Sequence, residues 1–113
     1  MALFKMEPDP FFWADEVGLS RPGVKEPVEI RVKFKYLDKE ETEAFFASLK
    51  PAAKGEKQKT DLEALSEIML DWEGPDAVYG KETLANLLRH FQPAALELFR
   101  AFRRELLEAK RKN

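Results

Sequence analysis

The sequence contains no cysteine and only one histidine among its 113 residues. Without cysteine the chain can form no disulfide, thiolate metal site or cysteine nucleophile. His90 has no orienting carboxylate or nucleophile at helical spacing, so we interpret it as a surface residue of a helix. The sequence also lacks a glycine-rich phosphate loop and a nucleophile elbow. We therefore expect a protein that is not an enzyme and that holds no metal or cofactor.

Long apolar runs and a dominant charge are absent as well. No apolar run approaches the roughly 18 residues that span a bilayer, and the first eight residues do not have the pattern of a signal peptide. The 19 basic and 21 acidic residues give a net charge of -2, so no overall field attracts nucleic acid or an anionic membrane. We expect a cytoplasmic protein with no membrane partner.

Apolar residues make up 44% of the chain, and they include nine phenylalanines and two tryptophans. A chain of this length and composition can bury a substantial core, and it fits one domain over residues 1–113.

Residues 1–37 contain the signals of a β-hairpin. Residues 28–36 alternate between apolar and charged side chains, which is typical of a strand with one buried face. Residues 11–17 are apolar at both ends, and the turn sequence Ser20-Arg21-Pro22-Gly23 follows them. A two-stranded hairpin is marginally stable alone, so its apolar face must be covered by helices of this chain or by another molecule.

Two capping boxes predict the starts of helices in residues 38–113. Asp38-x-x-Glu41 opens a helix that Pro51 stops, and Thr60-x-x-Glu63 opens one with apolar residues on one side as far as Trp72. Residues 50–59 between them form a polar connector.

A third helix is predicted over residues 81–91, and a fourth begins near Pro93 and runs to about Lys112. The expected fold class is therefore α+β and mainly helical, with an N-terminal hairpin of two antiparallel strands followed by about four α-helices.

Charge is distributed unevenly over these helices. Residues 60–76 hold six acidic and no basic residues, whereas the last helix has a net basic balance of six to three. One hypothesis is head-to-tail self-assembly through these two regions, a contact that builds rings or open spirals. The alternative is that both are ordinary solvated faces. The basic helix could also grip phosphates, although its interleaved glutamates would repel a nucleic-acid backbone.

The predicted hairpin supplies a second kind of surface. Its aromatic residues are first of all core, but the outer edge of a hairpin also offers unpaired backbone groups for strand addition, and Lys33 and Lys35 have the character of residues that prevent unwanted pairing. The candidate residues for partner binding or self-assembly are Phe12, Trp13, Lys33, Lys35, Glu67, Asp71, Arg100, Arg103 and Arg104.

Several motifs, spread almost from end to end, resemble the short tail assembly chaperones of long-tailed bacteriophages and prophages. They include Met1-Ala2-Leu3 followed by Pro8-x-Pro10, Asp38-Lys39-Glu40-Glu41, the run from Asp61 to Gly74, and the ending Arg111-Lys112-Asn113. The residues expected to determine the fold are Trp72, Gly74, Leu84, Leu87, Leu88, Phe91, Pro93, Phe99 and Phe102. Two departures concern loops: Gln92 separates Phe91 from Pro93, and Pro75 follows Gly74 where a β-branched residue is more usual.

The resemblance implies a protein of the host bacterial cytoplasm that binds the tape measure protein and recruits tail tube subunits without entering the mature virion. It also implies a homo-oligomer and a longer, frameshift-extended form of the chain, for which Arg111-Lys112-Asn113 can be encoded by the slippery heptamer A-AAA-AAC. The alternatives are a small nucleic-acid-binding regulator that uses the basic C-terminal helix and a minor structural component of the tail.

Overall fold

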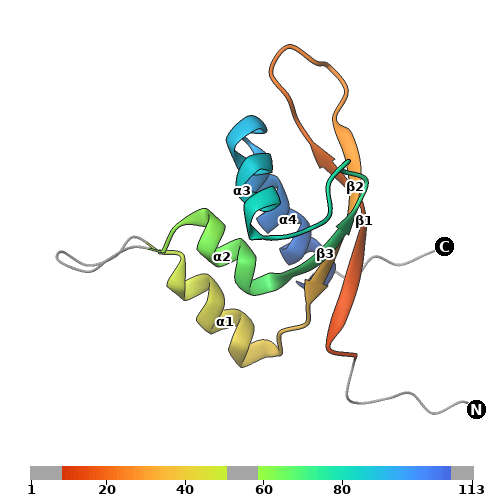
Figure 1. Ribbon diagram of the computed structural model, residues 1–113. Coiled ribbons are helices and arrows are strands. Elements are labelled where there is room, and N and C mark those ends of the chain that lie inside the picture. Colours follow the sequence, from red (N-terminus) through yellow and green to blue (C-terminus); the bar gives the residue numbers. More distant parts are fainter. Residues whose placement is uncertain (1–8, 51–58, 108–113) are drawn as a thin grey trace, which may run out of the picture.

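The computed structural model describes residues 9–50 and 59–107. The elements in chain order are β1 (Phe11–Leu19), β2 (Val28–Lys35), α1 (Lys39–Ser48), α2 (Asp61–Ile68), β3 (Met69–Glu73), α3 (Lys81–His90) and α4 (Ala94–Leu107). In these residues the fold is α+β, with one antiparallel sheet in the order β1-β2-β3 and four helices (Figure 1). Our expectations for the opening eight residues, for most of the connector (51–58) and for the basic ending (108–113) lie outside the described residues.

The predicted hairpin is confirmed, and a β-bulge adjusts it. β1 pairs with β2 in a register that shifts between Ala14 and Val17, so that Asp15 and Glu16 together oppose one residue of β2. Glu16 has a positive φ of 56°. Ala14 and Val17 are three residues apart and would point to opposite faces of a regular strand, but the extra residue turns both of them into the core.

The prediction of only two strands is wrong, because β3 forms a third. The helix expected to run through Trp72 ends at Ile68, and the chain continues directly as a strand alongside β2. The register shifts here as well, with Met69 opposite Phe34 and Asp71 opposite Lys33, so Leu70 is the extra residue. This bulge turns both Met69 and Trp72 inward, and their spacing then imitates the period of a helix.

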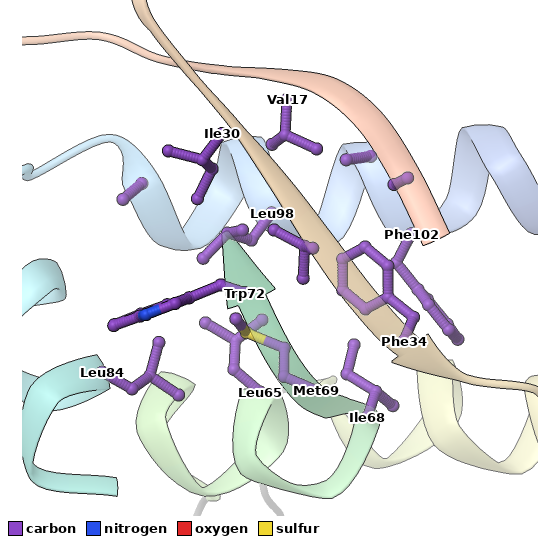
Figure 2. Packing of buried hydrophobic residues seen from close by; sticks show 14 of the residues in the cluster. Val17, Ile30, Phe34, Leu65, Ile68, Met69, Trp72, Leu84, Leu98 and Phe102 are labelled. Carbon is purple, nitrogen blue, oxygen red and sulfur yellow. The ribbon is translucent and has the colours of Figure 1, made fainter. Parts of the chain in front are cut away.

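The helices lie on one side of the sheet (Figure 1), and the core fills the space between them. Figure 2 shows Phe34 of β2 beside Phe102 of α4, and Trp72 between Leu84 and the sheet. Of the motif residues in this part of the chain, Leu84 of α3 is fully buried, whereas Leu87, Leu88 and Phe91 are partly buried and pack against the core from its margin.

The predicted capping box of the first helix is confirmed in full. The Asp38 carboxylate accepts a hydrogen bond from the Glu41 backbone N–H at 2.8 Å, and the Glu41 carboxylate accepts one from the Asp38 backbone N–H at 3.1 Å. At the second helix the Thr60 hydroxyl accepts a hydrogen bond from the Glu63 N–H at 3.2 Å. Both helices therefore begin where the sequence indicates, because side chains satisfy backbone donors that a helix start leaves unpaired.

Replacement of Asp38 by alanine is expected to lower the free energy of unfolding by about 1 kcal/mol, because the Glu41 N–H loses its acceptor. Asp38→Asn is the matched control, since an asparagine side chain is an equally good cap. Urea unfolding followed by circular dichroism compares the two. Equal losses in both variants would show that the charge of Asp38, and not its capping bond, stabilises α1.

Candidate functional site

The face of the sheet away from the helices carries a row of aromatic and cationic side chains, which we call the open face: Phe11, Trp13, Arg31 and Lys33. The Lys33 ammonium lies 4.0 Å from the centroid of the Phe11 ring, and the Arg31 guanidinium lies 4.6 Å from that of Trp13. These cation–π contacts cover part of the aromatic surface with the stems of the basic residues. The open face is therefore less apolar than its sequence suggests.

Arg31 connects all three strands at this face. Its guanidinium donates to the carboxylate of Asp15 on β1 and to that of Glu73 on β3, each at 2.5 Å. The hydrogen bonds to Asp15 and then to Glu73 raise the pKa of Arg31 above its already high usual value, so it stays charged. All three side chains are well exposed, so water and salt screen these pairs and they add little stability. Two carboxylates around one guanidinium leave no basic surplus at this point.

A second candidate surface is a groove of about 630 Å³ between α1 and the C-terminal end of α4, which we call the α1–α4 groove. Its floor includes Phe46, whose ring centroid lies 5.4 Å from that of Phe45 and 6.1 Å from that of Phe102. Phe45 is buried and Phe46 is only partly so. The residues that line the groove are Tyr36, Leu37, Lys39, Thr42, Glu43, Phe46, Arg103, Leu106 and Leu107.

Besides Tyr36, the polar residues of the α1–α4 groove are of two kinds. The Thr42 hydroxyl is held inside the fold, 2.7 Å from the Asp38 carbonyl oxygen and 3.2 Å from that of Leu37. Lys39, Glu43 and Arg103 are exposed and form no ion pair with any residue in the described ranges 9–50 and 59–107. The groove thus combines an apolar floor with two cations and one anion that are available to a partner.

The structure separates the candidate residues of the hairpin from one another. Phe12 belongs to the core, with its ring centroid 5.7 Å from that of Phe34 and 6.0 Å from that of Phe102. Trp13 and Lys33 lie together on the open face. Lys33 does not protect an edge, as we had interpreted it, because β2 is the central strand and β1 and β3 pair with it on either side. Lys35 is exposed at the end of β2.

The acidic candidates have partners within the fold. The Glu67 carboxylate accepts from the Lys59 ammonium at 2.6 Å, and the Asp71 carboxylate accepts from the Trp72 N–H at 2.8 Å. Burial, and to a lesser degree the negative charge of Asp71, raises the pKa of Tyr79. The acidic region therefore engages residues of its own surroundings, and no ion pair joins it to α4 in the part of the chain that the structure describes.

The basic candidates of α4 differ in exposure. Arg100 and Arg103 are exposed, whereas Arg104 is partly buried, with its Nε 3.7 Å from the Glu105 carboxylate. Only Arg103 of the three lines the α1–α4 groove.

The motif residues expected to determine the fold lie mostly around the core. Trp72 is buried, and its indole N–H donates to the Ala77 carbonyl at 2.8 Å, which fixes the loop after β3. Gly74 has a φ of +125°. Leu84 and Phe102 are fully buried. Phe99 is partly buried against the core, and Pro93 is exposed immediately before α4.

Sequence reasoning missed the α1–α4 groove, whose lining joins α1 to the end of α4. Neighbouring residues of an α-helix point about 100° apart, so Phe45 is buried whereas Phe46 is only partly buried and also lines the groove. This pair is the signal that could have indicated a second apolar surface. In residues 9–50 and 59–107 there is no helix that could cross a membrane and no cluster of side chains that could hold a metal ion.

Comparison with known proteins identifies a family. The model of a family described as phage tail assembly chaperone matches residues 1–113, which is the whole chain. No curated protein and no solved structure matches.

Proposed function

The chain belongs to the phage tail assembly chaperone family, and from this membership we propose that it binds the tape measure protein of its phage and recruits tail tube subunits to it. It does so in the cytoplasm of the host bacterium, through binding and without catalysis, and it leaves before the particle is complete. The observation that carries this proposal is the family match over the entire chain.

The physical need for such a protein follows from the shape of its partner. A long helix with an exposed apolar stripe aggregates unless another surface covers the stripe. A helix of this kind is recognised by an apolar groove with polar margins, and the α1–α4 groove is a surface of that type. Many weak contacts from an oligomer would hold the partner firmly and still allow the tube to displace the chaperone. Self-association of the chain is therefore part of the proposal.

Coexpression with the tape measure protein of the same phage or prophage tests the proposal. We expect the tape measure protein to precipitate when it is produced alone and to stay soluble and copurify when this chain is present. Tail tube protein should then join the complex. It should bind this chain less well when the tape measure protein is absent. Size-exclusion chromatography with light scattering measures the mass of this chain alone, of its complex with the tape measure protein, and of that complex after tail tube protein is added. A tape measure protein that precipitates equally in both cases would contradict the proposal.

Two further measurements separate the rival functions. Mass spectrometry of purified particles distinguishes a chaperone from a structural tail component, since only the latter is retained. Binding to nucleic acid that weakens steeply with added salt would instead indicate a regulator that contacts phosphates. The longer product is tested by reading the gene for the heptamer A-AAA-AAC at Arg111-Lys112-Asn113 and for an overlapping frame beyond it.

A further inference from the structure

The floor of the α1–α4 groove is suited to hydrocarbon and not to polar ligands. Phe46, Leu106 and Leu107 supply apolar surface, and Leu107 is 54% exposed. The buried hydroxyl of Thr42 lies within hydrogen-bonding distance of two backbone carbonyls of its own chain. Since a small-molecule site needs a few polar groups that converge on the ligand, a groove whose inner hydroxyl is already engaged favours apolar side chains.

The walls of the groove favour a helix as the structure that carries those side chains. One wall is α1 and the other is the end of α4, so a third helix can contact both and bury its stripe as helices do in grooves. The groove is formed by this chain alone, with Phe46 packed on Phe102, which is fully buried. No strand of the sheet needs to move.

The charges around the groove indicate which charged side chains flank the apolar stripe of that helix. Lys39 and Arg103 are cationic and Glu43 is anionic, and none of them has an ion-pair partner among the described residues. The rim therefore has one surplus positive charge, which is complementary to a helix with carboxylates beside its apolar stripe. On the open face, by contrast, Asp15 and Glu73 already neutralise Arg31.

We propose that the α1–α4 groove is the seat of an amphipathic helix of the tape measure protein, with leucine-like side chains against Phe46 and Leu107 and a carboxylate opposite Arg103. This inference rests on the proposed function and goes beyond it by assigning the partner to one surface. The candidate residues Trp13 and Lys33 then lie outside the contact.

Two variants and two matched controls test the assignment by coexpression with the tape measure protein. Leu107→Asp removes an exposed leucine of the groove, whereas Leu96→Asp removes an equally exposed leucine of α4 (53%) that lies outside it. We expect Leu107→Asp to weaken binding about tenfold or more, the value for one leucine side chain lost from a buried contact, and Leu96→Asp to bind as the unmodified chain does. Both leucines are exposed, so neither change should affect folding, which circular dichroism verifies.

The charge variants follow the same logic. Arg103→Glu should weaken binding severalfold at low salt, with a smaller difference at high salt because exposed charges are screened. Arg89→Glu, an exposed position on α3 away from the groove, should have no effect. If Arg103→Glu and Arg89→Glu weaken binding equally at low salt, the proposal that the partner helix carries a carboxylate opposite Arg103 is wrong.

A photo-crosslinking residue placed at position 107, and in a control chain at position 96, identifies what occupies the groove. We expect crosslinks from position 107 to a tape measure segment with apolar residues three and four apart and neighbouring carboxylates, and none from position 96. Crosslinks from position 107 to a second copy of this chain would overturn the assignment. Binding that survives both groove variants would reject this site and leave the proposed function intact, whereas failure of the unmodified chain to bind would reject both.

Discussion

Replacement of Phe102 by alanine is expected to destabilise the fold by about 3–5 kcal/mol, the range for removing a buried phenylalanine from a core. Phe102 is fully buried. Its ring centroid lies 5.2 Å from that of Phe34 and 5.8 Å from that of Phe45, so one side chain joins α4 to the sheet and to α1. Because a small domain is stable by only about 5–15 kcal/mol, this single change removes a large part of its stability.

Phe99 provides the matched control on the same helix. It is only partly buried, and within the part of the chain that the structure describes its one aromatic contact is to Phe45, at 6.3 Å between ring centroids. Phe99→Ala should therefore cost clearly less than Phe102→Ala, although both remove the same side chain. Urea unfolding followed by tryptophan fluorescence measures the two, provided that the slope against urea is unchanged. Equal losses would mean that the aromatic cluster around Phe102 does not hold the helices on the sheet.

Local signals in the sequence predicted a large part of this fold. The alternation in residues 28–36 identified β2, and the acceptors at Asp38 and Thr60 identified the starts of α1 and α2. Each of these features is determined by residues within a few positions of one another, through the pleat of a strand or the free N–H groups of a helix start. They are therefore readable without knowledge of the rest of the chain.

The third strand could not be read in this way, because a bulge hides its period. With Leu70 as an extra residue, Met69 and Trp72 both face the core, and this spacing also fits the helix that precedes them. Tertiary pairing decides between the two, since β2 has a second edge whose N–H and C=O groups need partners. Only the position of β2 in the sheet reveals that edge.

The candidate surfaces were predicted less well, because each is assembled from distant parts of the chain. Arg31 contacts Asp15 and Glu73, and these three residues come from three different strands. The α1–α4 groove likewise joins residues near position 40 to residues near position 105. Of the candidates for partner binding, Arg103 lines that groove, while Phe12 belongs to the core.

Gly74→Ala is expected to cost between about 2 and 6 kcal/mol. The φ of Gly74 is +125°, a conformation that side-chain-bearing residues rarely adopt and that costs about 1–3 kcal/mol. The added Cβ would also lie 2.9 Å from the Ile30 Cγ2 and 3.3 Å from the Ile30 Cα, and such overpacking costs about 1–3 kcal/mol more. Ile30 cannot retreat easily, because it is paired with Val17 of β1 and the next residue, Arg31, is paired with Glu73 of β3.

Gly23 provides a control that separates the backbone cost of a positive φ from the steric cost of the added Cβ. It also has a positive φ, +76°, but a Cβ built there meets nothing within 4 Å. Gly23→Ala should therefore cost only the backbone part, about 1–2 kcal/mol. In an Ile30→Ala background, which removes Cγ2, Gly74→Ala should become less costly than in the unmodified chain, as a double-mutant cycle would show. If Gly74→Ala costs no more than Gly23→Ala, the close approach of the chain after β3 to Ile30 does not constrain position 74, and its glycine is explained by φ alone.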